Sequence, residues 1–302
     1  MADFLVTGAA GGVGGVSRSL VELLIGAGAS VRAMVRREDE RAEALRTLGA
    51  QVVVGDLTEP RDVYAAVQGV GAMFFNMSVS EAYLRATAVV CAAAQESGGP
   101  GLLVNMSQMT VSQMTLTSTT ESQQHRLHWL AERVIDWSGL PVTHLRPTVF
   151  IDNPLFVHLN AASVRDRHEL VLPFGDGRTS PIAPVDVARV AAAILLDPSR
   201  GRPRICELTG PEVLDHQGLA RAMSQALGHP VAAVDLDYDL WVAQVLRPAG
   251  LPSHVEQHIA TMARLHRMGR YDRLTDVVAD VTGRSAMTVE QYVSRHRVRF
   301  GG

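Results

Sequence analysis

Residues 7–15, TGAAGGVGG, place a glycine cluster directly between two patterned runs of the chain. The run before it, DFLVT at 3–7, is apolar and β-branched, which predicts a buried strand. The run after it, at 16–27, has apolar residues at helical spacing and predicts an amphipathic helix. A glycine-rich loop at such a junction is typical of a phosphate site, because the start of a helix offers free N–H groups and partial positive charge.

Three glycines of this loop, Gly8, Gly11 and Gly14, have the spacing G-x-x-G-x-x-G. Glycine at these positions permits a turn with positive φ, a close approach of the backbone to a diphosphate, and tight packing of the helix on the strand. A flexible turn is the alternative, but it would not require a strand before the glycines and a helix after them. We therefore expect a dinucleotide to bind here through Thr7, Gly8, Gly11, Gly12, Val13 and Gly14.

Strand-like and helix-like runs alternate through the first half of the chain. The strand-like runs are residues 3–7, 30–35, 51–55, 71–77, 101–106 and 141–146. This alternation predicts an α/β fold with a doubly wound parallel sheet and right-handed crossovers. After Pro147 short strand-like pieces are mixed with helices. We therefore expect a dinucleotide-binding domain over 1–150 and a smaller, mainly helical substrate-binding cap over 151–302, with some segments returning to the core sheet.

The composition is that of an ordinary globular protein, with 47% hydrophobic residues, 20% charged residues and a formal net charge of −3. This charge provides no basic field, so nucleic acid is not an expected partner. The longest apolar runs fall far short of the roughly 20 residues of a membrane span, and the N-terminus lacks the pattern of a signal peptide. We therefore expect a cytoplasmic protein that does not bind membranes.

Cysteine and lysine usage narrows the chemistry further. The two cysteines, Cys91 and Cys206, lie in a predicted buried helix and a predicted buried strand, and the chain has no Cys-x-x-Cys or Cys/His cluster. We therefore expect a reducing compartment and no structural metal. All 28 basic residues are arginine, which excludes Schiff-base chemistry and any lysine-assisted mechanism.

The end of the second strand distinguishes the two nicotinamide dinucleotides. A site selective for NAD places Asp or Glu about 20 residues beyond the glycine loop, whereas this chain has Arg36 and Arg37 there. Guanidinium groups suit a 2′-phosphate, so NADP(H) is the expected cofactor. The alternative is a pair of solvated arginines beside Glu38 and Asp39.

Further cofactor contacts are expected where other strands end, because ligands of such sheets bind at the carboxyl ends. Asp56, with Leu57 beside it, ends the third strand and either accepts a hydrogen bond from the adenine amino group or caps the helix near Pro60. Ser107 follows the fifth strand and is expected to face the nicotinamide, with an ordinary loop cap as the alternative. After the fourth and sixth strands, the expected contacts are Asn76, Met77, Ser78, Pro147, Thr148, Val149 and Phe150.

Several stretches together resemble one known family. They are TGAAGGVG at 7–14, VRAMVRR at 31–37, VVVGDL at 52–57, GLPVTHLRPTVFIDN at 139–153, SPIAPVDVARVAAAIL at 180–195, CELTGPE at 206–212 and GRYDRLTDVV at 269–278. This arrangement resembles the NmrA-like group of the atypical short-chain dehydrogenase/reductases over essentially the whole chain. The resemblance implies a Rossmann core with a C-terminal substrate domain that binds NADPH. Members are either reductases of quinones, dyes and other small carbonyl or imine-like compounds, or regulators that sense the NADP(H) pool without turnover.

One departure from the family pattern concerns catalysis. Catalytic members often carry Tyr-x-x-x-Lys at the start of the fifth helix, and these positions match Gln124 and His128 here. General-acid catalysis by tyrosine is therefore not expected. His128 is expected to contact the nicotinamide ribose in place of the lysine, and it could donate a proton near neutral pH. A partly exposed helical histidine is the alternative, and His125 is a weaker candidate. His128 and Ser107 are thus the candidate catalytic residues.

An apolar substrate pocket is expected between the sheet edge and the cap, lined by aromatic side chains and by adaptable methionine. Its expected members are Gln108, Met109, Phe150, Asn153, Phe156, Tyr238 and Trp241. Core packing is the alternative for such residues, and it is favoured for Met106.

These features favour an NADPH-dependent reductase that transfers hydride to a small, largely apolar acceptor of the quinone, enone or carbonyl type. The alternative from another class is a non-catalytic NADP(H) sensor that acts through a protein partner. The apolar pocket favours the enzyme, and the missing Tyr-Lys pair favours the sensor. The oligomeric state is left open, and a homodimer is compatible with the sequence.

Overall fold

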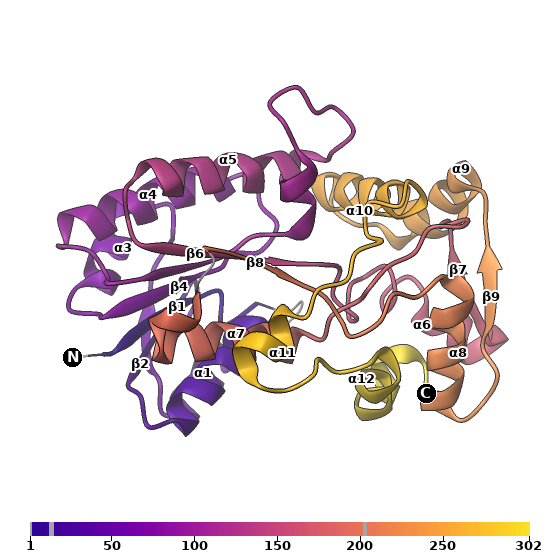
Figure 1. The fold of residues 1–302 in the computed structure, drawn as a ribbon, viewed down its shortest axis with the longest axis horizontal. Coiled ribbons are helices and arrows are strands. Elements are labelled where there is room, and N and C mark those ends of the chain that lie inside the picture. Colours follow the sequence, from indigo (N-terminus) through magenta and orange to yellow (C-terminus); the bar gives the residue numbers. More distant parts are fainter. Residues whose placement is uncertain (1, 12–14, 202–203) are drawn as a thin grey trace.

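The computed structural model describes residues 2–11, 15–201 and 204–302. Within these ranges, seven strands form one parallel sheet in the order β3-β2-β1-β4-β5-β6-β8 (Figure 1). The strands are β1 (Phe4–Thr7), β2 (Val31–Val35), β3 (Gln51–Val54), β4 (Ala72–Phe75), β5 (Leu103–Met106), β6 (Val142–Pro147) and β8 (Ile205–Leu208). The chain winds outward from β1 through β2 and β3, then from β4 through β5 and β6. The carboxyl ends of β1 and β4 therefore flank the point where the winding direction reverses, which is where ligands of such sheets bind.

Helices cover both faces of this sheet, as Figure 1 shows. One face carries α3 (Pro60–Val67), α4 (Tyr83–Glu96) and α5 (Gln123–Trp137). The other face carries α1 (Val16–Gly26), α2 (Glu40–Thr47), α7 (Pro184–Leu196) and α11 (Val277–Thr282). Every residue of β1, β4, β5 and β6 is buried because both faces of these central strands are covered, whereas the edge strand β3 is partly exposed.

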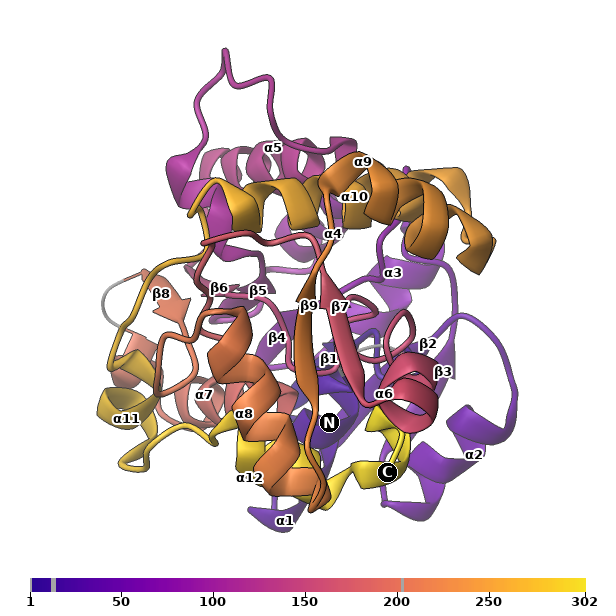
Figure 2. The ribbon, with the colours of Figure 1, turned by 90° about the vertical axis from the view of Figure 1, so that its right-hand side faces the viewer.

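The rest of the chain forms a second body with a hydrophobic cluster of its own. Its two strands, β7 (Glu169–Leu172) and β9 (Ala232–Asp235), pair in parallel and lie side by side in Figure 2. Its helices are α6 (Ala161–Arg167), α8 (His216–Leu227), α9 (Tyr238–Trp241), α10 (Ser253–Arg267) and α12 (Val289–Arg295). Its short helical turns lie at η3 (Val242–Leu246), η4 (Arg247–Ala249) and η5 (Arg297–Phe300), whereas η1 (Met109–Gln113) and η2 (Pro198–Gly201) pack against core elements. We call this body the cap.

The expected α/β fold with a doubly wound parallel sheet is therefore confirmed. The chain crosses between core and cap more than once, because α7, β8 and α11 all pack in the core although they follow residue 150. None of the helices in the described ranges combines the length and the apolar character that crossing a membrane requires.

Candidate functional site

The glycine loop packs tightly against the end of β4. Thr7 Oγ1 donates a hydrogen bond to the carbonyl oxygen of Asn76 at 2.8 Å and accepts one from the Asn76 N–H at 2.9 Å. Gly8 has φ +73°, and a Cβ there would lie 2.8 Å from the Asn76 carbonyl oxygen. A Cβ on Gly11 would lie 3.1 Å from the carbonyl oxygen of Gly8. Glycine is thus required at Gly8 by both conformation and space. Gly12, Val13 and Gly14 lie outside the described residues.

The start of α1 offers an anion site beside this loop. Gly15, with φ +55°, precedes the helix, and within the described residues neither a side-chain cap nor an acidic residue occupies its first turn. Asn76 Nδ2 donates to Ser17 Oγ at 2.9 Å and fixes α1 against the end of β4. An uncapped helix start next to glycines that lack a Cβ fits the diphosphate of a dinucleotide.

The two arginines that follow β2 are both exposed. Arg36 Nε lies 3.5 Å from Asp56 Oδ2, and no ion pair of Arg37 occurs among the described residues. Arg32 is occupied elsewhere, since it donates to the carbonyl oxygens of Ala66 and Gln68. Arg36 and Arg37, in contrast to Arg32, keep their guanidinium groups exposed at the end of β2.

A third arginine, Arg41 in the first turn of α2, was not identified from the sequence. Its guanidinium donates to the Ala10 carbonyl oxygen of the glycine loop at 2.8 Å and pairs with Asp39, which caps α2. Arg41 thus connects the glycine loop to the helix that follows Arg36 and Arg37. The sequence offered a basic residue near Asp39 but no sign that it folds back onto the loop.

Asp56 stabilises the turn at the end of β3. Its Oδ1 accepts hydrogen bonds from the N–H and the hydroxyl of Thr58, both at 2.8 Å. These bonds, followed by the charge of Arg36, hold the pKa of Asp56 below its usual range. The N-cap of α3 is Glu59, so Asp56 braces the preceding turn and does not cap the helix. Leu57 beside it is partly buried against the core.

The positions that match the family's Tyr and Lys both face the core from α5. Gln124 Oε1 accepts a hydrogen bond from the Ser80 N–H at 3.2 Å. One turn later, the His128 ring lies 4.3 Å from the ring of Tyr83, measured between centroids. Tyr83 is fully buried, and its hydroxyl donates to the Met106 carbonyl oxygen at the end of β5. Gln124 and His128 are thus held at the carboxyl ends of β4 and β5.

His128 is partly buried, and burial lowers the pKa of its imidazole to about 3. At neutral pH this ring is therefore uncharged, and the expectation that it donates a proton near neutrality is not supported. A neutral ring still offers one N–H donor and one acceptor nitrogen. Contact of His128 with the cofactor stays a prediction.

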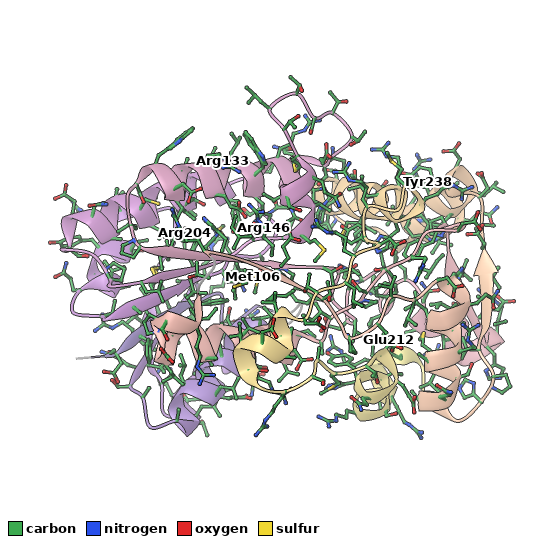
Figure 3. The ribbon with its side chains drawn as sticks, in the orientation of Figure 1. Met106, Arg133, Arg146, Arg204, Glu212 and Tyr238 are labelled. Carbon is green, nitrogen blue, oxygen red and sulfur yellow. The ribbon has the colours of Figure 1, made fainter. Side chains whose placement is uncertain are left out.

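A buried ion pair lies one turn further along α5. Arg146 donates to both carboxylate oxygens of Glu132, at 2.9 and 2.5 Å. Burial acts to raise the pKa of Glu132, but Arg146 and His144 together hold that pKa below its usual range. Figure 3 shows Arg146 between the sheet and α5. This pair fixes the register of α5 over the site.

Unpaired polar atoms gather where β5 and β6 end and α5 begins. Within the described structure, the following buried atoms have no hydrogen-bond partner: Ser107 Oγ, Gln108 Nε2, Thr110 Oγ1, Gln124 Nε2, His128 Nδ1 and Thr148 Oγ1. A buried polar atom without a partner costs about 1–3 kcal/mol. Such a group of donors and acceptors therefore fits a polar ligand, as the nicotinamide end of a dinucleotide would be.

The segment after β6 is already bonded through part of its backbone. The Thr148 N–H donates to the Leu208 carbonyl oxygen at 2.9 Å, and the Val149 carbonyl oxygen accepts from the Ile182 N–H at 3.0 Å. Pro147 is buried at the end of the strand, and Phe150 packs against the core. Among the backbone groups of this segment, those two are committed to the fold and do not face a ligand.

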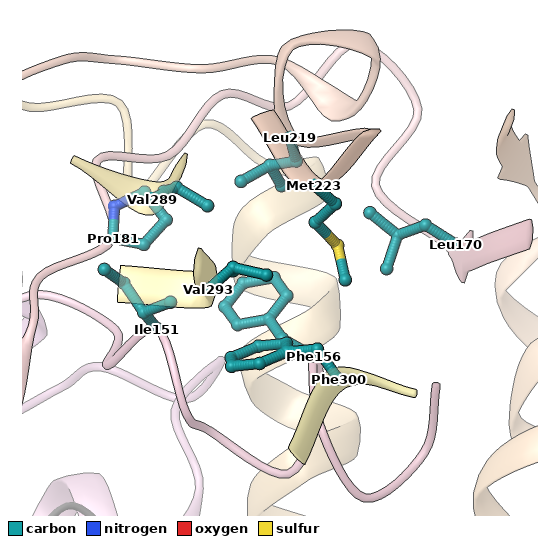
Figure 4. A pocket seen from close by; sticks show the side chains of 9 residues that line it. All are labelled: Ile151, Phe156, Leu170, Pro181, Leu219, Met223, Val289, Val293 and Phe300. Atoms are coloured by element: carbon teal, nitrogen blue, oxygen red, sulfur yellow. The ribbon is translucent and has the colours of Figure 1, made fainter. Parts of the chain in front are cut away.

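The expected pocket residues fall in different parts of the structure. Gln108 and Met109 lie near the sheet edge, whereas Phe156, Tyr238 and Trp241 lie in the cap. Met109 is buried in η1, and Gln108 precedes it. Phe156 belongs to the cap core, where it lines a small apolar cavity with Phe300 (Figure 4). Trp241 is fully enclosed in the same cap core.

Tyr238 also lies away from the sheet edge. Its hydroxyl donates to the Ala260 carbonyl oxygen, and Figure 3 shows it beside α9, far from Met106. Phe156, Tyr238 and Trp241 thus pack the cap, and their role in a substrate pocket stays a prediction. Large apolar residues serve a core and a pocket equally well, so their type alone does not separate the two. Asn153 uses its Oδ1 to accept from the Leu155 N–H, and Nδ2 contacts Met262 Sδ at 3.9 Å.

Sequence reasoning also missed a polar group at the start of α5. Ser122 caps this helix, and its hydroxyl contacts both His125 and His258, the latter on α10 of the cap. Ser122 and His258 are 136 positions apart, so no local pattern joins them.

The fold and the site define a protein that binds a nicotinamide dinucleotide at the carboxyl edge of a doubly wound sheet. Residues 8–198 match the model of the NAD(P)H-binding family, and the chain belongs to that family. The expected cofactor class, a nicotinamide dinucleotide, is thereby confirmed.

Individual relatives share the whole length of the chain. An NAD(P)H azoreductase of Xenophilus azovorans is 28% identical over 296 residues, covering 96% of this chain and 98% of that protein. The structure of an NADPH-dependent quinone oxidoreductase of Escherichia coli, complexed with NADPH, has a TM-score of 0.83 at 20% identity, covering 97% and 99% of the two chains. The negative transcriptional regulator NmrA, in complex with NADP, has a TM-score of 0.78 at 17% identity, covering 97% and 94%. The last two comparisons establish a common fold.

Proposed function

We propose that this protein is an NADPH-dependent reductase of a small, largely apolar conjugated acceptor, of the azo or quinone class. The observation that carries the proposal is the group of unpaired buried polar atoms beside α5, directly across the sheet edge from the uncapped start of α1. A site that only stabilised the fold would not leave so many polar atoms without partners. The full-length similarity to an azoreductase supports the choice of acceptor class.

The described residues would divide the binding of the cofactor among three places. Thr7, Gly8 and Gly11 shape the loop, and the first turn of α1 offers its N–H groups to the diphosphate. Asp56 lies where it would accept from the adenine amino group, although Thr58 and Arg36 already use part of its capacity.

The 2′-phosphate of NADPH would be held by guanidinium groups. Arg36 and Arg37 are exposed at the end of β2, and Arg41 is fixed nearby by its bond to Ala10. Arginine makes paired hydrogen bonds to phosphate oxygens that the hydroxyl of NADH cannot match. We therefore propose a preference for NADPH over NADH.

The nicotinamide end would be oriented by Ser107, His128 and Thr148. Their unpaired Oγ, Nδ1 and Oγ1 atoms can hydrogen-bond the ribose and the carboxamide. When bound, the reduced nicotinamide supplies a hydride, and the acceptor then needs one proton from another source. Positioning of the acceptor and exclusion of water are the tasks of the protein.

A second candidate is a non-catalytic NADP(H) sensor that acts through a protein partner. Gln124 and His128, where the family's catalytic members have Tyr and Lys, favour it. The two candidates differ in one observable, which is consumption of the bound cofactor.

The deciding experiment follows NADPH oxidation by absorbance against methyl red, menadione and a cyclic enone, with NADPH affinity measured in parallel. Turnover with any acceptor, faster than the reaction without protein, supports the reductase. Tight binding of NADPH and NADP⁺ without consumption supports the sensor and refutes the reductase.

A further inference from the structure

A chain of three polar side chains crosses the interface between α5 and the cap. Ser122 Oγ lies 2.9 Å from His125 Nδ1 and 2.8 Å from His258 Nδ1. The same oxygen accepts a hydrogen bond from the His125 N–H at 3.2 Å. His258 is on α10, so the chain is complete only when the cap lies against α5.

The hydrogen bonds fix the ring tautomers. The Ser122 N–H donates to His125 Nδ1 at 3.2 Å, so this nitrogen carries no hydrogen and the ring is protonated at Nε2. Ser122 Oγ, at 2.9 Å from the same nitrogen, must point its hydrogen there, because two lone pairs would otherwise face each other. Its remaining lone pair faces His258 Nδ1, which must therefore carry a hydrogen.

The two ends of this chain differ in their surroundings. His125 is fully buried, and its Nε2 has no hydrogen-bond partner within residues 2–11, 15–201 and 204–302. His258 is only partly buried, and its Nε2 is not among the buried atoms that lack a partner in the described residues. The chain has a buried N–H donor at His125 and an acceptor nitrogen at the less buried His258, so a proton can pass from His258 toward His125.

We propose that His258, Ser122 and His125 form a proton relay that brings from water to the acceptor the one proton that must accompany the hydride. The relay rests on the proposed function, because it supplies the proton for which Gln124 and His128 offer no acidic group. His125 would be the catalytic residue, since its Nε2–H would touch the acceptor, while Ser122 and His258 act through it.

The proton steps balance along the chain. The N–H bond of His125 Nε2 breaks as a proton passes to the acceptor atom left negative by reduction. The Ser122 hydroxyl proton moves to His125 Nδ1, the His258 Nδ1 proton moves to Ser122 Oγ, and His258 Nε2 takes a proton from water. The rings regain their first tautomers by exchange with water after the product leaves.

Burial favours neutral rings, which this relay requires. Burial lowers the pKa of His258 to about 4 and, with further contributions from His258, His128 and Arg270, keeps that of His125 well below its ordinary value. Arg270 follows α10 and pairs with Glu121 at 3.1 Å, beside Ser122. Both lowered pKa values favour the uncharged ring near pH 7.

The alternative is that these contacts only cap α5, since Ser122 and His125 form a capping box. The variant His258→Asn separates the two roles. The asparagine amide can keep the hydrogen bond to Ser122 Oγ, but it has no second nitrogen through which a proton could pass. His254→Asn, one turn earlier on α10, is the matched control.

The first readout does not depend on turnover. Nitrogen-15 NMR of histidine-labelled protein at pH 7 is expected to show His258 protonated at Nδ1 and His125 at Nε2. The opposite tautomer on either ring overturns the relay.

The second readout is steady-state reduction of methyl red or menadione by NADPH. His258→Asn is expected to lower kcat on the order of 100-fold with unchanged NADPH affinity and unchanged melting temperature, while His254→Asn resembles the wild type. Wild-type kcat in His258→Asn overturns the relay alone. Absence of turnover in the wild-type protein refutes the proposed function and the relay together.

Discussion

The buried pair of Glu132 and Arg146 offers a sharp test of what holds α5 over the site. The side chains are 1% and 7% exposed, and two hydrogen bonds join them. Glu132→Gln keeps the shape but leaves the guanidinium without a counter-charge. Breaking a pair this deeply buried costs about 3–5 kcal/mol of unfolding free energy.

Replacing both partners has a different expected result. Glu132→Leu together with Arg146→Met removes both charges and fills the space with apolar atoms, which is neutral or stabilising by roughly 1–4 kcal/mol in comparable cases. Urea unfolding followed by circular dichroism measures both variants. The exposed pair of Arg18 and Glu22, at 3.3 Å, is the control, and Glu22→Gln is expected to cost about 0.5 kcal/mol or less. A loss below about 1 kcal/mol in Glu132→Gln, or an equal loss in the double variant, would refute this reasoning.

Three further predictions concern the site and the acid stability of the fold. Gly8→Ala is expected to raise the Kd for NADPH at least about tenfold, because the new Cβ would lie 2.8 Å from the Asn76 carbonyl oxygen. Gly28→Ala is the control, since Gly28 also has a positive φ but has open space around it, and this variant should leave the Kd unchanged. His128→Ala is expected to weaken NADPH binding through loss of one hydrogen bond. An unchanged NADPH affinity in calorimetric titration, together with unchanged turnover in the oxidation assay, would exclude His128 from the site. His266 is buried between Phe174 and Tyr271 with its pKa lowered to about 3, so the unfolded chain binds a proton that the folded chain rejects between about pH 6.5 and 3. The free energy of unfolding should therefore decrease as the pH is lowered through that window. His266→Phe should reduce the dependence of this free energy on pH by about one proton, measured by urea unfolding at several pH values, and an unchanged dependence contradicts this.

The sheet and its ligand edge were predictable because they depend on local patterns. Strand-like and helix-like runs alternate along the first half of the chain, and this alternation predicts a parallel sheet. The glycine loop marks β1 as the first strand of that sheet. The contact between Thr7 and Asn76 follows from that topology, since β1 and β4 are neighbours.

Contacts that depend on the fold of distant segments were not predictable. Arg41 reaches Ala10 only because α2 begins at Asp39 and turns its first residues back toward the loop. Ser122 and His258 meet because the cap places α10 against α5. The burial of Phe156 and Trp241 in the cap core was not predictable either, because apolar side chains have the same character in a core and in a pocket.

The arginines at the end of β2 are expected to select a cofactor with a 2′-phosphate. Calorimetric titration with NADPH and NADH tests this selectivity most directly, on the wild-type protein and on the double variant Arg36→Ala, Arg37→Ala. We expect NADPH to bind more tightly than NADH, and the double variant to lose about tenfold or more of its NADPH affinity while its NADH affinity changes little. Equal losses for both nucleotides, or no heat with either one, would contradict the account.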